Sequence, residues 1–209
     1  MGTLVLNGIY DLDLLRTLKT PTMKWGADLR GKSSQLVTFK DLKTVAHELQ
    51  EENEMMLILE DESPETVFSF IDLIKKENFK VPWLLQFRDI RPASFYQQFQ
   101  FPFSWRFNPE GDWREIISLP HLQNILLPVE FADHLTEDFW AVVDQRNLQI
   151  YLHFNHFEEF FRFKNLNKDL SLSIDLTSEV ELSYRKPNKV LIQTYVDSLK
   201  QRVFQTSEL

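Results

Sequence analysis

The strongest constraint on this chain is a regular alternation of short apolar runs with helical patterns, repeated along almost its whole length. Eight runs have the length and the apolar or alternating composition of parallel strands with at least one buried face. These runs are Leu4–Leu6, Met23–Leu29, Met55–Leu59, Pro82–Phe87, Phe103–Phe107, Asn124–Phe131, Leu148–Phe154 and Leu170–Leu176. They recur about every 20 to 30 residues, which leaves room for one helix after each strand.

Helix signals follow the runs in turn. Thr38, Ser63 with Pro64, and Thr136 are residue types that begin helices, and apolar stripes at helical spacing follow them. Further helices are expected at Asp11–Leu18, Ala93–Phe99, Asp112–Leu119, Phe157–Phe163 and from Val190 to Leu199. The alternation predicts an α/β protein, a single compact (β/α)8 TIM barrel formed by residues 1–209. The alternative is an open doubly wound sheet, but no Gly-rich phosphate fingerprint supports it.

Composition excludes several classes of protein. Hydrophobic residues make up 43% of the 209 residues, enough for a substantial core. The formal net charge of -8 argues against nucleic acid or an anionic membrane as a partner. No apolar run approaches the roughly 20 residues that span a bilayer, and the N-terminal segment lacks the features of a signal peptide. Because cysteine is absent, thiolate chemistry and disulfides are excluded, and we expect a cytoplasmic protein.

Polar residues cluster where the last strand ends. Leu170 to Leu176 alternates apolar and polar residues, and Asp175, Ser178 and Glu179 emerge at its carboxyl end. Ligands of parallel α/β folds bind at this end of the strands. We therefore expect any site to lie at the carboxyl ends of the eight strands.

Several stretches resemble phosphoribosylanthranilate isomerase, the small barrel enzyme of tryptophan synthesis. They lie in the family's order and spacing between about Leu4 and Val203, and we list them as they stand. They are LNGIYDLDLL, GADLRGKSSQLVTFKDL, MLILEDESPETVFSFID, WLLQFRD and DLTSEVELSYRKPNKVLIQTYVDSLK. The resemblance implies a (β/α)8 barrel without a cofactor, as a monomer or homodimer, whose ligand is a small phosphorylated or anionic molecule.

The residues that the family uses for acid–base chemistry are changed. The resemblance places the family's general base, a cysteine after the first strand, at Asn7, and an amide is neither acid nor base near pH 7. The family's general acid, an aspartate after two leucines, falls on Pro128. Glu130, two residues on, would point to the same side if the strand continued, and Asp175 is retained. Glu130 and Asp175 are therefore the candidate catalytic groups.

The family's phosphate-binding glycines are also replaced. They fall on Phe154-Asn155 and on Glu179, whose negative charge would repel a phosphate. Gln86 and Ser178 survive, whereas Arg88 stands where the family has histidine. Candidate ligand-binding residues are Arg30, Gln86, Arg88 and Ser178.

Each candidate also has an alternative interpretation. Arg30 and Arg88 could instead pair with Asp28, Glu60 or Glu130 in a surface network. Those carboxylates, with Asp175 and His153, could gather into a metal site, although no metal is predicted. Asn7 could be a satisfied polar group at a strand end, and His156 could cap a helix.

Function is therefore expected to have diverged. The chain is interpreted as a barrel that resembles the isomerase, has lost its activity and acts by binding a ligand or partner. Two alternatives stay open: an isomerase that uses Glu130 or Asp175, and a different enzyme activity at the barrel mouth.

Overall fold

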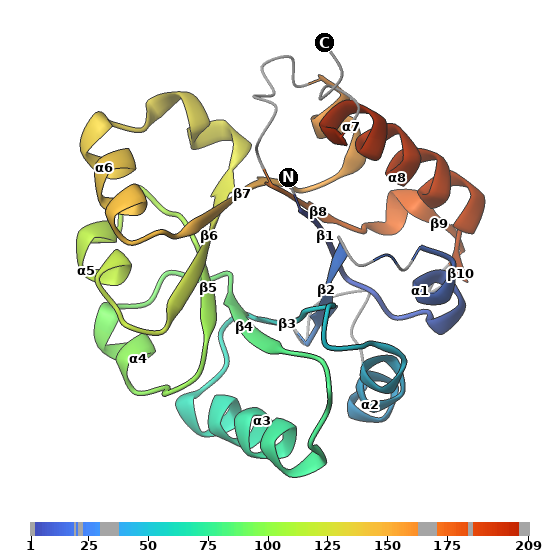
Figure 1. Ribbon diagram of the computed structural model, residues 1–209, viewed down its shortest axis with the longest axis horizontal. Coiled ribbons are helices and arrows are strands. Elements are labelled where there is room, and N and C mark those ends of the chain that lie inside the picture. Colours follow the sequence, from blue (N-terminus) through green and yellow to red (C-terminus); the bar gives the residue numbers. More distant parts are fainter. Residues whose placement is uncertain are drawn as a thin grey trace.

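The computed structural model describes residues 3–18, 20, 23–29, 38–162, 171–183 and 186–204, and it shows a closed barrel of parallel strands (Figure 1). The strands are paired in sequence order, and β1 closes the ring against β8. Their bounds are β1 Leu4–Asn7, β2 Met23–Asp28, β3 Met55–Leu59, β4 Trp83–Phe87, β5 Phe103–Arg106, β6 Leu122–Pro128, β7 Gln149–Phe154 and β8 Ser171–Asp175. The predicted (β/α)8 barrel of the α/β class is thus confirmed.

A helix follows each strand, and the helices form an outer ring around the barrel (Figure 1). They are α1 Leu12–Leu18, α2 Phe39–Glu48, α3 Pro64–Glu77, α4 Ala93–Gln97, α5 Trp113–Ile117, α6 Glu137–Gln145, α7 Phe157–Arg162 and α8 Lys189–Phe204. Short 3-10 helices, η1 Val129–His134 and η2 Ser178–Val180, follow β6 and β8. No helix within the described residues is long and apolar enough to cross a membrane.

The helix starts predicted from the sequence are confirmed. Thr38, Ser63 and Thr136 each accept a hydrogen bond from a backbone N–H three residues on, at 3.2, 3.4 and 3.4 Å. Such bonds satisfy donors that the first helical turn leaves open. His156 caps α7 in the same way, because its Nδ1 accepts from the backbone N–H of Glu159 at 3.3 Å.

Two expectations were wrong in detail. The sixth strand ends at Pro128 rather than at Phe131, because the chain turns there into the 3-10 helix η1. The segment from Thr177 to Asn188, whose polar composition predicts a loop, contains two short strands, since β9 Glu181–Ser183 and β10 Lys186–Pro187 pair as an antiparallel hairpin.

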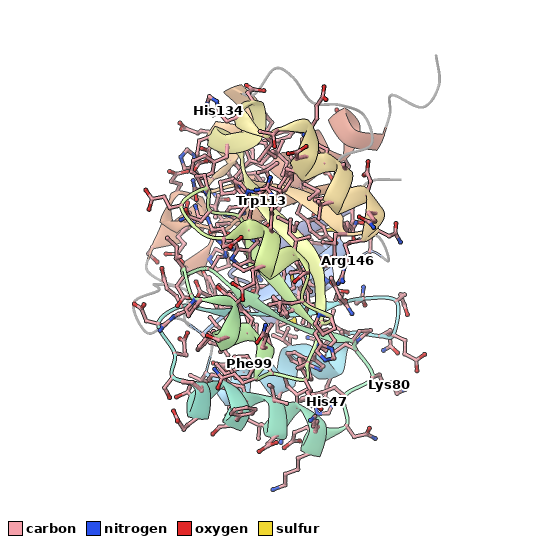
Figure 2. All side chains as sticks on the ribbon, turned by 90° about the vertical axis from the view of Figure 1, so that its left-hand side faces the viewer. His47, Lys80, Phe99, Trp113, His134 and Arg146 are labelled. Carbon is pink, nitrogen blue, oxygen red and sulfur yellow. The ribbon has the colours of Figure 1, made fainter. Side chains whose placement is uncertain are left out.

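The core has two layers. The larger one holds most of the buried apolar side chains, from the strands and from the helices around them, and Figure 2 draws these among all the side chains of the molecule. On the β4 side it is strongly aromatic: Phe87 packs on the rings of Phe95, Tyr96 and Phe99 with centroid distances of 5.6, 5.2 and 5.9 Å. The smaller layer is a separate cluster of Val5, Met56, Leu84, Leu126 and Tyr151. These residues come from alternate positions of five strands, as expected for side chains that point into the barrel.

On both sides of this small cluster along the barrel axis, the inward-pointing positions of the strands carry polar side chains. On the amino-terminal side, Lys24 pairs with Glu54 at 2.9 Å and lies 5.4 Å from the centre of the Tyr151 ring. The Tyr151 hydroxyl donates to Gln149 Oε1 at 2.8 Å. Toward the carboxyl end the buried polar residues are Asn7, Asp28, Gln86, Arg88, Ser104, His153 and Ser173. The small apolar cluster therefore lies directly beneath a polar site at the barrel mouth.

Candidate functional site at the barrel mouth

Four of the sequence-predicted residues converge at the carboxyl ends of the strands. Asn7 ends β1, Gln86 lies in β4, Arg88 follows β4, and Asp175 ends β8. The pairing of β1 with β8 places Asn7 beside Asp175. His153, which the sequence suggested only as a metal ligand, lies in β7 and is fully buried in the same group.

Arg88 is the centre of this group, and protein atoms satisfy its whole guanidinium. A guanidinium carries five N–H donors. Nη1 donates to Asp175 Oδ2 and to His153 Nε2, both at 3.0 Å, and Nη2 donates to Asp175 Oδ1 at 2.8 Å. With the Gln86 amide oxygen facing the guanidinium, that oxygen accepts from Nε and from Nη2, each at 2.7 Å. Each of the five N–H donors of Arg88 therefore has an acceptor on Asp175, His153 or Gln86.

This arrangement corrects the surface-network interpretation of Arg88, whereas ligand binding by Arg88 stays a prediction. Its side chain is only 1% exposed, so it does not belong to a surface network. Its partner is Asp175, and not Asp28, Glu60 or Glu130. Because no donor is left over, Arg88 cannot also bind a phosphate or carboxylate without giving up an internal partner.

Asp175 is equally occupied. Its two oxygens accept from both Arg88 terminal nitrogens, and Oδ1 also accepts from Asn7 Nδ2 at 3.0 Å. An ionised carboxylate has about four acceptor positions, and these three described hydrogen bonds take up most of them. A proton transfer to or from a substrate would have to disrupt this bidentate pair.

His153 is held neutral at the centre of the barrel. Arginine can only donate, so Nε2 must accept from Arg88, and the ring proton lies on Nδ1, 3.2 Å from Ser173 Oγ. Burial, followed by the positive charge of Arg88, lowers the pKa of His153 to about 3. The alternation His153–Tyr151 along one face of β7 is the sequence signal that could have placed this residue inside the barrel.

Asn7 is a buried polar group at the end of β1, and only its amide nitrogen is satisfied. It is 1% exposed, and its Nδ2 donates to Ser173 Oγ at 2.8 Å and to Asp175. Its Oδ1 has no hydrogen-bond partner among the described residues. A Cβ on Gly26 of the neighbouring strand would lie 2.3 Å from that oxygen, so glycine is required there.

We therefore expect Gly26→Ala to lower the free energy of unfolding by about 2 kcal/mol, the typical cost of forcing an extra methyl group into a packed interior. Urea denaturation measures the change. In an Asn7→Ala background, which removes the clashing oxygen, the same substitution should cost clearly less. An equal cost in both backgrounds would show that Asn7 Oδ1 is not the obstacle.

A pocket of about 310 Å³ opens beside the Arg88 group. It is lined by Arg88, Asp89, Ile90, Arg106, Phe107, Asn108, Glu130 and Phe131. Glu130 reaches it from η1 and is exposed, so it does not project from β6 beside Asp175 as the sequence suggested. Within the described part of the chain, no three His, Asp or Glu side chains gather in a way that could hold a metal ion.

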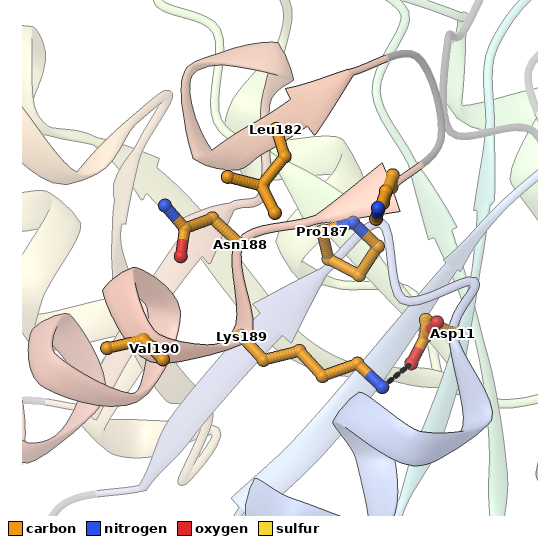
Figure 3. A pocket seen from close by; sticks show the side chains of 7 residues that line it. Asp11, Leu182, Pro187, Asn188, Lys189 and Val190 are labelled. Carbon is orange, nitrogen blue, oxygen red and sulfur yellow. Dashed lines mark ion pairs between the residues drawn. The ribbon is translucent and has the colours of Figure 1, made fainter.

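The remaining predicted residues are not placed in the site. Arg30 lies outside the described residues, and of Ser178 only the backbone, in η2, is described. A second pocket, of about 420 Å³, lies between the β9–β10 hairpin, the start of α8 and Asp11 (Figure 3). Lys189 pairs there with Asp11 at 3.4 Å.

The fold and the mouth together define a (β/α)8 barrel whose central polar site is filled by its own side chains. Neither a protein-family model nor a curated protein sequence matches the chain. Solved structures of phosphoribosylanthranilate isomerase do match it in fold. A monomeric form of the dimeric Thermotoga maritima enzyme has a TM-score of 0.65 at 16% identity, and the match covers 96% of this chain and 99% of that one.

Two further structures agree. The same kind of enzyme in complex with reduced 1-(o-carboxyphenylamino)-1-deoxyribulose 5-phosphate gives a TM-score of 0.67 at 14% identity, over 96% of this chain and 99% of that one. The Thermus thermophilus enzyme gives 0.57 at 19% identity, over 94% and 99%. The resemblance predicted from the sequence is thus confirmed for the fold.

Proposed function

We propose that this protein is a phosphoribosylanthranilate-isomerase-like barrel that no longer catalyses the isomerisation and acts by binding a ligand or partner. The observation that carries the proposal is the Arg88–Asp175 pair. The Arg88 guanidinium and the Asp175 carboxylate occupy the mouth and bind each other through hydrogen bonds of 2.8 and 3.0 Å.

The chemistry of the resembling family requires a general acid, a general base and a phosphate anchor. In this chain Asn7 replaces the base, and the end of β6 carries the apolar Pro128. His153 is neutral with both ring nitrogens in contact, and Asp175 is paired. These features support a loss of acid–base function, because the positions that the resembling family uses for its base and its acid carry an amide and a proline here, and Asp175 is already paired.

The ligand of one structural neighbour sharpens the comparison. Reduced 1-(o-carboxyphenylamino)-1-deoxyribulose 5-phosphate carries both a carboxylate and a phosphate. In this chain the guanidinium of Arg88 is already paired, and Glu179 adds an exposed negative charge in η2, after β8. Both features disfavour a doubly anionic ligand on the barrel axis.

The proposal includes a single domain over residues 1–209, a cytoplasmic location, and a monomer or homodimer without a cofactor. The isomerase alternative uses Glu130, which lines the 310 Å³ pocket at the mouth, or Asp175, which is paired with Arg88. A different enzyme activity would have to use the same pocket.

Turnover of phosphoribosylanthranilate, followed by the loss of its fluorescence, tests the proposal. We expect rates equal to buffer for the wild-type protein and for Asn7→Cys, because restoring one base rebuilds neither the acid nor the phosphate anchor. An active isomerase is the positive control, and thermal unfolding checks that the variant is folded. Turnover by the wild-type protein would refute the loss of activity, and Glu130→Gln and Asp175→Asn would then show which carboxylate is responsible.

A further inference from the structure

The second pocket, between the β9–β10 hairpin and the start of α8, holds the two most exposed large apolar side chains of the described residues. Leu182 of β9 is 63% exposed and Val190 of α8 is 79% exposed, and both line this pocket of about 420 Å³ (Figure 3). Pro187 of β10 is a third apolar lining residue. Apolar side chains that gather on a surface beside polar residues mark a site of interaction.

The walls of the second pocket are held in place by contacts between distant segments. Lys189 of α8 pairs with Asp11 at 3.4 Å and with Asp13 at 3.2 Å, which ties the start of α8 to the start of α1. The backbone N–H of Asn188 donates to the carbonyl oxygen of Val180 at 2.7 Å, which ties the hairpin to η2. The lining side chains are therefore placed before a ligand arrives, which lowers the entropic cost of binding.

The charges of the second pocket leave one cation without a partner in the described part of the chain. Its charged lining residues are Asp11, Lys186 and Lys189, of which Asp11 and Lys189 pair with each other. The neighbouring carboxylate of Glu181 accepts from the Tyr10 hydroxyl at 2.7 Å. Lys186 is exposed and makes no ion pair or hydrogen bond with any residue that the structure describes. An anionic group would therefore be received by Lys186, whose ammonium is a compact point charge.

The size and lining of the second pocket suit a small molecule. Its volume lies within the range of about 300 to 1,000 Å³ that small-molecule sites occupy, and such sites are lined mainly by apolar side chains with few polar groups. A neutral apolar molecule would leave Lys186 unused, and an organic cation would be repelled by it. The matching occupant therefore has an apolar chain and one negative group.

We infer that the second pocket binds a small amphipathic anion, an aliphatic chain that ends in a carboxylate. The carboxylate pairs with Lys186, and the chain lies on Leu182, Pro187 and Val190. The second pocket shares no lining residue with the Arg88 group. The inference therefore goes beyond the proposed function and does not depend on whether the isomerase activity is lost.

Four probes test the inference by NMR titration of the whole chain with labelled leucine and valine methyl groups. The signals of Leu182 and Val190 are assigned from Leu182→Ser and Val190→Ser. We expect octanoate to shift both signals and to bind about tenfold more tightly than butanoate, which lacks four methylene groups. Uncharged 1-octanol should bind about threefold more weakly than octanoate, and octylammonium should bind more weakly still.

Variants separate the charged contact from the apolar one. Lys186→Gln should weaken octanoate about threefold and leave 1-octanol unchanged, because it removes the charge and keeps most of the side chain. Leu182→Ser should weaken both probes. Lys80→Gln changes an exposed lysine after α3, and as the matched control it should alter neither affinity.

Three results would overturn the inference: methyl signals of Leu182 and Val190 that octanoate does not shift, equal affinities for octanoate and octylammonium, or an unchanged octanoate affinity in Lys186→Gln. A dimer in light scattering that Leu182→Ser dissociates would also overturn it, since a second copy of the chain would then cover the pocket. Turnover of phosphoribosylanthranilate tests only the proposed function, so the two proposals fail separately.

Discussion

Asp175→Asn is expected to lower the free energy of unfolding by about 3 kcal/mol, because it leaves the charge of Arg88 buried without its counter-ion. The Arg88 side chain is 1% exposed, so water cannot replace the lost carboxylate. Urea denaturation at pH 7 measures the change, and the slope of the transition should stay the same.

The chain supplies a matched control for this substitution. Arg114 and Asp138 form a pair at 3.4 Å whose side chains are 62% and 79% exposed. Asp138→Asn should therefore cost less than about 0.5 kcal/mol. The double variant Arg88→Met, Asp175→Leu should lose less than the sum of the single changes, since no unpaired charge remains. An Asp175→Asn protein as stable as the wild type would show that the pair contributes nothing.

His153 should make the protein sensitive to acid. Its pKa is lowered from 6.5 to about 3 in the folded state, chiefly by burial. Between these two values the unfolded chain binds one proton that the folded chain excludes, so the stability falls as the pH falls. This one group changes the free energy of unfolding by about 1.4 kcal/mol per pH unit, chiefly between pH 6 and pH 4.

The comparison of wild type with His153→Gln at pH 7 and at pH 5 isolates this effect. The wild type should lose about 2 kcal/mol more than the variant between the two pH values, even if the variant is less stable at both. His134→Gln changes an exposed histidine and should follow the wild type. Parallel losses in wild type and His153→Gln would show that the buried ring does not control the acid response.

Local signals account for what the sequence could predict. The run Met55–Leu59 and the cap Ser63 with Pro64 are recognisable without any partner, and both are confirmed. The end of β6 at Pro128 was missed because Val129 to Phe131 continue an apolar pattern that a strand and a 3-10 helix share.

The central pair could not be predicted, because its members are distant in sequence. Arg88 and Asp175 are 87 residues apart and meet only when eight strands close into a ring. The alternation of side chains along a strand places Leu84, Gln86 and Arg88 on one face, but it does not show that a carboxylate of β8 lies opposite. The charged residues at the strand ends therefore suggested a ligand-binding site, whereas in the structure Arg88 and Asp175 pair with each other inside the barrel.

The closure of the ring also sets an order of events during synthesis. β1 and β8 pair through Asn7 and Asp175, which are separated by 168 residues. At about 5 to 20 residues per second, a ribosome needs roughly 10 to 30 s to add that length of chain. Throughout that interval the amide of Asn7, and later the guanidinium of Arg88, exist without their final acceptor. The nascent chain must therefore keep its polar interior hydrated until β8 emerges, and the last barrel strand to be made is the one that expels the water.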